Sequence, residues 1–278
     1  MKQLFDKVSF TNSKTLTRTY STSFSMGIRF FKKQVRQPIY SIYGFVRLGD
    51  EIVDTFHDYN KEQLFEEFKK EVYQSIERKI SLNPILNSFQ WVVNKYHIDK
   101  ILIEQFLKSM EMDLYNSEYN QRSYEDYILG SAEVVGLMCL KVFVNGDEEH
   151  YNKLKMCAMK LGSAYQKVNF LRDLQSDYNE LGRTYFPELN INSFNDITKQ
   201  EIIDDIEADF QEAYPGIKAL PRSARFGVFI SYIYYLTLLK KIRRTPPSVL
   251  LHKRIRISNA RKYMLLFNNA VRYKLKLI

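Results

Sequence analysis

Polar residues in the stretch from Gly162 to Pro187 have a spacing that could serve chemistry. At positions i, i+3, i+7 and i+11 stand Gln166, Asn169, Asp173 and Asp177. A helix turns about 100° per residue, so these side chains would share one narrow arc and present only carboxylate and carboxamide oxygens. The two aspartates are four residues apart and repel each other by roughly 0.2–0.5 kcal/mol on a free helix. The stripe favours a bound cation, although a solvated acidic face explains a single pair of this kind about equally well.

A second stripe with similar spacing lies in the helix expected from Pro38 to His57. Its members, at i, i+4, i+7 and i+11, are Tyr43, Arg47, Asp50 and Asp54. Apolar residues cover most of the remaining circumference, and a helix that is apolar nearly all round is buried. Two aspartates on a buried helix need pairing, protonation or a metal ion. Alternatively, Arg47 satisfies one aspartate as a structural ion pair.

Two such helices facing each other across a cavity would form a metal site of oxygen ligands. Carboxylates and the Asn169 amide oxygen suit Mg²⁺ or Mn²⁺ and are poor ligands for Zn²⁺. Mg²⁺ commonly bridges protein carboxylates to substrate phosphates, and Arg47, Arg183 and the basic C-terminal residues would neutralise the remaining phosphate charge. The 20 Tyr and 19 Phe residues can line an apolar cavity and stabilise carbocations through their π faces. A long hydrocarbon that carries a diphosphate fits all these features.

Length and composition favour one folded, all-helical domain over residues 1–278. The net charge of +9 indicates an anionic partner, and no nucleic-acid-binding motif accompanies the charge. The N-terminus lacks the apolar region of a secretory signal, and the apolar segment from Gly227 to Leu239 is too short to span a membrane. Cys139 and Cys157 have no CxxC or His partner, so we expect buried, reduced thiols and a cytoplasmic protein.

Several segments around the two stripes allow expectations about the fold. After an irregular start, Tyr20–Ser25 enters a helix, with its hydroxyls serving either as an N-cap or as phosphate contacts. Tyr124–Val144 reads as a core helix whose small residues permit close approach of another helix or of a ligand. Ile202–Ala213 is expected to be a short helix with Asp204, Asp205 and Asp209 on a solvated face, ended by a turn at residues 214–216. Two further helices are expected over residues 219–241 and 248–273.

The motifs together resemble those of the squalene/phytoene synthase family, over nearly the whole chain. They are YSTSFS at Tyr20–Ser25, YGFVRLGDEIVD at Tyr43–Asp54, AEVVGLM at Ala132–Met138, QKVNFLRDLQSD at Gln166–Asp177, GRTYFP at Gly182–Pro187 and LPRSARFGV at Leu220–Val228. A weaker match is KRIRIS at Lys253–Ser258. One DxxxD motif is weak evidence, whereas two, combined with NxxxDxxxD and GRxYxP, form a specific signature.

This resemblance implies an all-α isoprenoid-synthase fold with a central active-site cavity. It implies a Mg²⁺-binding set of Asp50, Asp54, Asn169, Asp173 and Asp177, with Tyr43 and Arg47 joining the four aspartates as catalytic residues. Contacts to the diphosphate or the reacting carbons would come from Ser21, Ser23, Phe24, Tyr43, Arg47, Gln166, Asn169 and Arg183. Two positions depart from the family pattern. Ser176 stands where an acidic residue is common, and Glu133 replaces a usual glycine.

The implied activity is Mg²⁺-dependent head-to-head condensation of two prenyl diphosphates. The expected reaction joins two geranylgeranyl diphosphates through a cyclopropylcarbinyl diphosphate to give phytoene, a step of carotenoid biosynthesis. The same chemistry on farnesyl diphosphate, giving squalene or dehydrosqualene, is the alternative, and a non-catalytic prenyl-lipid-binding or assembly protein is a second one. Because substrate and product are lipids, peripheral contact with the inner face of the membrane through the C-terminus is a further expectation. Val271–Ile278 would otherwise pack on the body or stay disordered.

Overall fold

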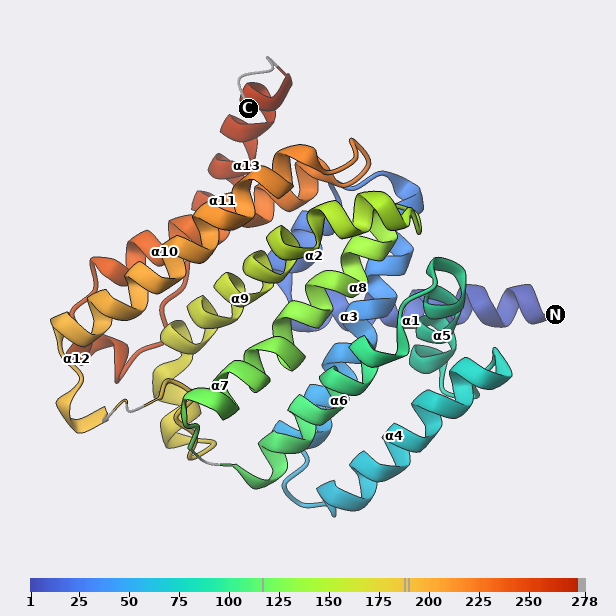
Figure 1. The fold of residues 1–278 in the computed structure, drawn as a ribbon, viewed down its shortest axis with the longest axis horizontal. Helices are drawn as coiled ribbons and strands as arrows, with labels where there is room; N and C mark the ends of the chain where they lie inside the picture. The colour runs from blue at the N-terminus through green and yellow to red at the C-terminus, as the bar shows by residue number, and fades with distance from the viewer. Residues whose placement is uncertain (117, 188, 190, 275–278) are drawn as a thin grey trace.

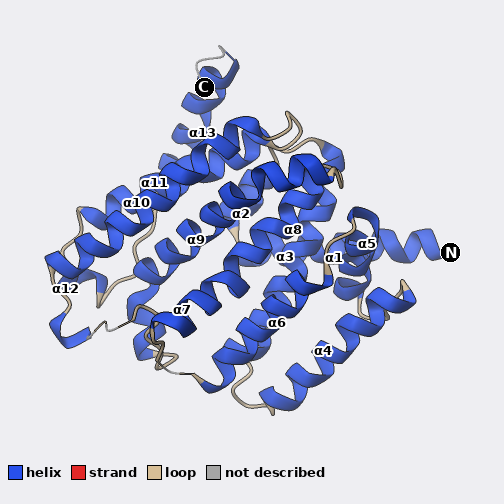
Figure 2. Ribbon diagram, viewed as in Figure 1, coloured by secondary structure: helices blue, strands red, loops and turns tan. Residues whose placement is uncertain are grey.

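The chain is built from helices joined by short connections (Figures 1 and 2). The computed structural model describes residues 1–116, 118–187, 189 and 191–274, and the side chains of these except residues 22, 23, 192 and 274. Within them there is no β-strand, only an isolated bridge between Glu118 and Thr184. The expectation of an all-α fold is confirmed.

The helices follow one another along the chain with the following bounds. They are α1 (Lys2–Tyr20), α2 (Thr22–Ile28), α3 (Lys33–Asp54), α4 (Lys61–Arg78), α5 (Pro84–Tyr96), α6 (Lys100–Tyr115), α7 (Gln121–Ile128), the π-helix η1 (Leu129–Glu133), α8 (Val134–Phe143), α9 (Glu148–Asn179), the 3₁₀-helix η2 (Ile191–Ser193), α10 (Asp196–Ala219), α11 (Arg225–Arg243), α12 (Pro247–Leu250) and α13 (Asn259–Lys274).

Helix α3 is surrounded by other helices and carries one wall of the cavity described below. It packs against α1, α4, α5, α6 and α8. Phe45 is fully buried and stacks on Phe89 with 3.9 Å between ring centroids, and the Phe106 ring lies 4.8 Å away. This apolar packing around most of the helix confirms that the second stripe lies on a buried helix. The helix begins at Lys33, one turn before the predicted start, because Pro38 is tolerated in the second turn at the loss of one backbone hydrogen bond.

Helix α9 carries the other wall and belongs to a second apolar cluster. It packs on α8, η1, α10 and α11. The side chains of Ala164, Val168 and Leu171 are completely buried in this cluster. The 32-residue helix therefore holds its polar stripe on the side that faces away from this core.

The N-terminal segment was predicted to be irregular, and this prediction is wrong. Residues Lys2–Tyr20 form a helix whose buried face consists of Ser9, Ser13 and Thr17. These small polar residues recur every four positions. Ser9 and Thr17 donate hydrogen bonds to backbone carbonyls, and the Ser13 hydroxyl shares a hydrogen bond with the Ser88 hydroxyl. A core-facing stripe of hydroxyl residues lacks the apolar periodicity that identifies a helix in sequence.

The segment that follows helix α9 also differs from expectation. Helix α10 runs from Asp196 to Ala219, so the predicted turn at residues 214–216 lies inside the helix, with Pro215 in it. Asp209 is only 2% exposed and is not on a solvated face. Its carboxylate accepts hydrogen bonds from Lys160, Ser163 and Lys167 of α9, at 2.7–2.9 Å. The predicted helix over residues 248–273 is divided into α12 and α13 by a non-helical segment at residues 251–258.

The small residues between α7 and α8 pack against helices. A methyl group built on Gly130 would lie 2.4 Å from the carbonyl oxygen of Gln105 in α6, and one on Gly162 would lie 2.6 Å from the carbonyl oxygen of Ala132. From the sequence, the close neighbour of these small residues could be another helix or a ligand. In the structure the neighbour is a helix. No helix in the described part of the chain is long and apolar enough to cross a membrane.

Candidate active site

An open cavity of about 1700 Å³ lies between the α3 wall and the α9 wall. Its lining also includes residues of α1, α2, α7, α11 and the start of α13, and of the segments 181–185 and 251–258. Nearly all of the residues selected from the sequence reach it. They are Ser21, Phe24, Tyr43, Arg47, Asp50, Asp54, Gln166, Asn169, Asp173 and Asp177. Each stripe lines the cavity along one side of its helix, as its spacing predicted, and the structure places the two helices on opposite sides of one cavity.

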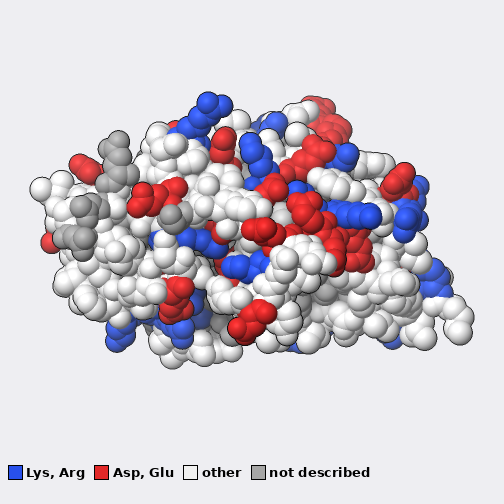
Figure 3. Space-filling view, turned by 90° about the horizontal axis from the view of Figure 1, so that it is seen from below, with Lys and Arg blue, Asp and Glu red and all other residues white. Residues whose placement is uncertain are grey.

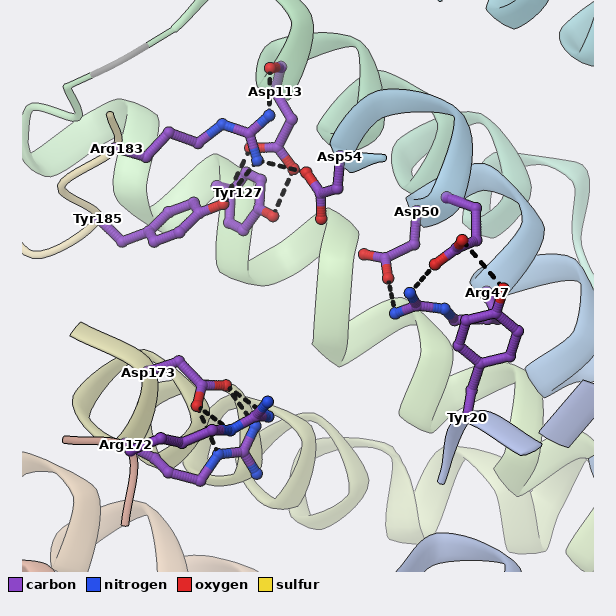
Figure 4. Close-up of polar contacts among 12 residues, drawn as sticks. Tyr20, Arg47, Asp50, Asp54, Asp113, Tyr127, Arg172, Asp173, Arg183 and Tyr185 are labelled. Carbon is purple, nitrogen blue, oxygen red and sulfur yellow. Dashed lines mark hydrogen bonds and ion pairs between the residues drawn. The ribbon is translucent and has the colours of Figure 1, made fainter. Parts of the chain in front are cut away.

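On the α3 wall, Arg47 joins two carboxylates. Its guanidinium forms ion pairs with Asp50, at 2.5 Å, and with Glu51 (Figure 4). The Tyr20 hydroxyl donates a hydrogen bond to Glu51 at 3.0 Å, and the Tyr20 ring centre lies 4.3 Å from the guanidinium carbon of Arg47. Arg47 therefore forms an ion pair with one aspartate of the stripe, Asp50. This is the alternative to a bound metal ion that the sequence left open.

On the α9 wall, Asp173 is held by two arginines. Arg172 donates to both carboxylate oxygens, at 2.9 and 2.5 Å, and the Nε atom of Arg254 lies 2.7 Å from Oδ1. Arg254 comes from the segment between α12 and α13, so this contact ties the C-terminal part of the chain to the α9 wall. The Tyr235 hydroxyl donates to the Asn169 amide oxygen at 3.2 Å.

Arg183 lies behind the cavity lining and reaches the α3 wall from the loop that follows α9. Its side chain is 6% exposed and donates to the Asp54 carboxylate at 2.5 Å and to the Asp113 carbonyl oxygen at 2.7 Å (Figure 4). The Asp113 carboxylate accepts hydrogen bonds from three tyrosine hydroxyls, those of Tyr119, Tyr127 and Tyr185. This network holds Asp54 in place through Arg183, and two of its tyrosines, Tyr127 and Tyr185, also reach the cavity lining.

The hydroxyl-rich segment before α2 has a capping role. Ser21 is the N-cap of α2, and its hydroxyl oxygen accepts a hydrogen bond from the Phe24 backbone N–H at 3.2 Å. The Ser21 side chain also lines the cavity, so the two roles left open by the sequence are compatible. The Phe24 ring stacks on Tyr43 with centroids 5.1 Å apart. The side chain of Ser23 lies outside the described residues.

Carboxylates on the two walls influence one another electrostatically. Burial and the negative charge of Asp54 raise the pKa of Asp50 above its usual range, against the effect of Arg47. Burial and the charges of Asp173 and Asp54 raise the pKa of Asp177 to about 8, although Arg183 and Arg172 act in the opposite direction. Because Asp54 on α3 raises the pKa of Asp177 on α9, the two walls share one region of negative potential.

These donors fit a hard divalent cation such as Mg²⁺. They are oxygen atoms on opposite walls, and their mutual repulsion would be relieved by positive charge. Across the described residues, however, no three His, Cys, Asp or Glu side chains lie close enough together to hold a metal. Arginines contact Asp50, Asp54 and Asp173 in this arrangement.

Sequence reasoning missed several residues of the site. Arg172 was not selected, although it is adjacent to Asp173 and lines the cavity. Arg254 was included only among the basic C-terminal residues, without its contact to Asp173. Asp113, Tyr127 and Tyr185 come from different parts of the chain, and only the fold brings them to Arg183. Tyr185 lies within the GRTYFP motif, which was the available signal for it.

The family model for squalene/phytoene synthase matches residues 17–261. The chain belongs to the squalene/phytoene synthase family. This family comprises prenyltransferases that condense prenyl diphosphates head to head. The family model covers all the cavity-lining residues from Tyr20 to Arg261.

Individual relatives are distant and carry different names. A 4,4'-diapophytoene synthase of Staphylococcus haemolyticus is 27% identical over 197 residues, covering 70% of this chain and 66% of the relative. A phytoene synthase of Cereibacter sphaeroides is 27% identical over 63% of this chain and 50% of the relative. The chain thus spans about two thirds or less of the length of these two relatives.

Solved structures show the same fold. A dehydrosqualene synthase in complex with a ligand superposes with a TM-score of 0.81 at 20% identity, and the match covers 99% of both chains. A squalene synthase from Alicyclobacillus acidocaldarius superposes with a TM-score of 0.75 at 20% identity, covering 86% of this chain and 94% of the other.

Proposed function

We propose that this protein is a Mg²⁺-dependent phytoene synthase, which condenses two geranylgeranyl diphosphates through a cyclopropylcarbinyl diphosphate. Residues 1–278 would act as one domain, because the cavity lining includes residues from Tyr20 near one end to Leu265 near the other. The observation that carries the proposal is the pair of carboxylate walls, with Asp50 and Asp54 on one side and Asp173 and Asp177 on the other.

The charged residues of the cavity would bind the diphosphate group of the substrate. The four aspartates with Asn169 would hold Mg²⁺, which when bound supplies Lewis-acid assistance to diphosphate departure. Arg47, Arg172 and Arg254 have guanidinium groups in the lining that can turn from aspartate to phosphate oxygens. Further positive charge in the lining comes from Lys240, Lys241, Arg244, Arg256, Arg261 and Lys262.

The aromatic residues of the cavity would surround the hydrocarbon chain of the substrate. Tyr165 and Tyr235 stack with ring centroids 4.0 Å apart, and Tyr235 reaches the lining beside Asn169. Phe170 and Tyr127 also reach it. Apolar rings exclude water from the prenyl chains, and their π faces stabilise an allylic cation without reacting with it.

The same chemistry on two farnesyl diphosphates is the second candidate. Relatives and similar folds named for 4,4'-diapophytoene, dehydrosqualene and squalene support it as much as phytoene synthases support the first. A non-catalytic prenyl-lipid-binding or assembly protein is the third. Such a protein has no need of carboxylates on both walls, and this chain has all of them.

Incubation of the purified protein with Mg²⁺ and each prenyl diphosphate, followed by identification of the hydrocarbon, tests the proposal. We expect phytoene from geranylgeranyl diphosphate and a much slower reaction with farnesyl diphosphate. Preferential formation of squalene or dehydrosqualene would replace the first candidate with the second. Binding of the prenyl diphosphates without turnover, with Mg²⁺ present, would favour the non-catalytic candidate.

A further inference from the structure

The carboxylate of Asp173 on the α9 wall has its hydrogen-bonding capacity in full use. Arg172 donates to Oδ1 at 2.9 Å and to Oδ2 at 2.5 Å (Figure 4). The Nε atom of Arg254 lies 2.7 Å from Oδ1, and its Nη2 atom lies 3.1 Å from Oδ2. Two carboxylate oxygens offer about four lone-pair positions, and these four contacts use them. A metal ion that coordinates Asp173 directly must therefore displace one of the two arginines.

The two arginines are held at Asp173 to different degrees. Arg172 is the neighbour of Asp173 on α9, and its side chain is 18% exposed. Arg254 comes from the non-helical segment 251–258, and its side chain is 43% exposed. An exposed guanidinium loses less when its ion pair breaks, because water replaces the hydrogen bonds. Arg254 is thus the arginine that a metal ion would displace.

Release of Arg254 from Asp173 requires no movement of the backbone. The segment 251–258 is anchored on both sides of Arg254, because Leu250, Ile255 and Ile257 are buried in the second apolar cluster. This anchoring holds the Cα atom in place and leaves the long, exposed side chain able to turn. The exchange is therefore a change of partner by one side chain.

A released Arg254 would have no carboxylate partner in its own part of the chain. Residues 213–278 contain no Asp or Glu. The charged cavity-lining residues of this part are all basic, namely Lys240, Lys241, Arg244, Arg254, Arg256, Arg261 and Lys262. Leaving Asp173 thus costs free energy unless an anion enters the cavity. Residues 275–278, at the end of the tail predicted to contact a membrane, lie outside the described residues.

We propose that Arg254 makes the binding of Mg²⁺ at the α9 wall depend on diphosphate. A bare Mg²⁺ ion has to displace a guanidinium that gains no new partner, so it binds weakly. When diphosphate enters with the ion, Arg254 exchanges carboxylate oxygens for phosphate oxygens, which are equally good acceptors for a guanidinium. Mg²⁺ and diphosphate then raise each other's affinity by the same factor. This inference rests on the proposed function, because it takes Asp173 as a metal ligand.

Such coupling would keep the α9 wall from taking up a metal ion without substrate. Asp and Glu side chains lie across much of the centre and right of the face seen from below (Figure 3). Negative surface potential raises the local concentration of cations whether or not they carry diphosphate. A counterion already present on Asp173 discriminates between the bare ion and the ion with diphosphate.

Binding of Mn²⁺ to Arg254→Met, with Mn²⁺ standing in for Mg²⁺, tests the coupling without turnover. The electron paramagnetic resonance signal of free Mn²⁺ reports the binding. The matched control is Arg256→Met, because Arg256 also lines the cavity and its described hydrogen bond is accepted by its backbone carbonyl. We expect Arg254→Met to bind Mn²⁺ alone at least about fivefold more tightly than wild type, since lone pairs of Asp173 become available. The control should stay within about twofold of wild type.

Calorimetric titration with inorganic pyrophosphate in excess Mg²⁺ gives the second half of the test. Here Arg254→Met should bind about tenfold more weakly than wild type, because it lacks the guanidinium that turns to the phosphate oxygens. Arg256→Met also removes a positive charge from the lining, so a weaker affinity for pyrophosphate is not diagnostic by itself. The diagnostic result is the pair of opposite changes in Arg254→Met, tighter for Mn²⁺ alone and weaker for pyrophosphate.

The proposal is overturned if Arg254→Met changes the affinity for Mn²⁺ no more than Arg256→Met does. It is also overturned if wild type binds pyrophosphate equally well in Mg²⁺ and in chelator. A wild type that binds neither Mn²⁺ nor pyrophosphate would overturn the metal site and the proposed function together. If the opposite changes are found but no prenyl diphosphate is turned over, the proposed function fails and the exchange at Asp173 stands.

Discussion

Arginines act as counterions at three of the four cavity aspartates. Arg47 pairs with Asp50, Arg172 with Asp173, and the buried Arg183 with Asp54. Arg47 and Arg172 line the cavity and can exchange a carboxylate for a phosphate, whereas Arg183 is enclosed by protein. We therefore propose that the first two arginines bind substrate and that Arg183 positions Asp54.

Replacement of Arg183 by Met tests this positioning role. The change leaves the Asp113 and Asp54 carboxylates without their shared cation, and removing one partner of a buried ion pair costs about 3–5 kcal/mol. We expect the free energy of unfolding in urea to fall by about 3 kcal/mol. The exposed Arg122→Met is the control, with a change within about 0.5 kcal/mol. Equal stability of the two variants would contradict the assignment.

A second residue-scale prediction concerns Asp209. Burial alone would raise its pKa, but hydrogen bonds from Lys167, Lys160 and Ser163 outweigh burial, and the pKa lies below its usual range. Ionised Asp209 therefore stabilises the fold at neutral pH, and this stabilisation is lost as the pH falls below the usual Asp pKa of about 3.9 and through the lower pKa of the folded state.

Urea unfolding of wild type and Asp209→Asn at several pH values checks this. The variant should be less stable than wild type by about 3 kcal/mol at pH 7, because two lysines lose their buried counterion. The difference should shrink as the pH falls below about 4. Asp126→Asn, at an exposed position of α7, should show almost no difference at either pH. If the difference in unfolding free energy between wild type and Asp209→Asn did not change with pH, the ionised form of Asp209 would not stabilise the fold.

At the scale of elements, close helix contacts hold the two walls at their separation. Helix α6 packs on η1 through Gly130, and η1 packs on α9 through Gly162. Both glycines have negative φ, so the reason for glycine at these places is the missing side chain. The series α6, η1 and α9 links the core around α3 to the wall on α9.

Gly130→Ala should disturb the packing of α6 on η1. Its methyl group would meet the Gln105 carbonyl oxygen at 2.4 Å, and overpacking of a core costs about 1–3 kcal/mol. We expect a loss of about 2 kcal/mol by thermal or urea unfolding. Gly27→Ala is the control, because its methyl group would have no neighbour nearer than 3.7 Å, and alanine favours helix by up to about 1 kcal/mol. If Gly130→Ala left the stability unchanged, α6 and η1 could move apart without a loss of folding free energy.

The sequence predicted those elements whose faces follow helical periodicity. The stripes on α3 and α9 each lie within one helix, so spacing alone brought Tyr43 to Asp54 and Gln166 to Asp177 together on their respective walls. α1 was missed because its buried face consists of Ser9, Ser13 and Thr17. Asp209 was wrongly predicted to lie on the solvated face with Asp204 and Asp205. Its position between Ile206 and Phe210, which are buried, indicates the buried side of the helix.

At the scale of the whole molecule, contacts between distant segments were beyond sequence reasoning. Arg183 meets Asp54 across 129 positions and the Asp113 carbonyl across 70, and Arg254 meets Asp173 across 81. No periodicity encodes these pairs, because they depend on how the helices are arranged. The uneven distribution of charge, by contrast, is visible in the sequence, because residues 213–278 contain 15 of the 41 Lys and Arg residues and none of the 32 Asp and Glu residues.

The two carboxylate walls are the central feature of the molecule, and each can be removed separately. Substitutions Asp50→Asn on α3 and Asp173→Asn on α9 keep the size of the side chain while removing one negative charge. Asp58→Asn, at an exposed position just beyond α3, serves as the control. Circular dichroism should show the same helical content in all three variants.

The most direct measurement is the rate of hydrocarbon formation from prenyl diphosphate with Mg²⁺ and with excess chelator. We expect wild type and Asp58→Asn to turn over only with Mg²⁺, and Asp50→Asn and Asp173→Asn to lose at least a hundredfold in rate. Wild-type rates in either wall variant, or turnover that persists with chelator present, would contradict a two-walled metal site.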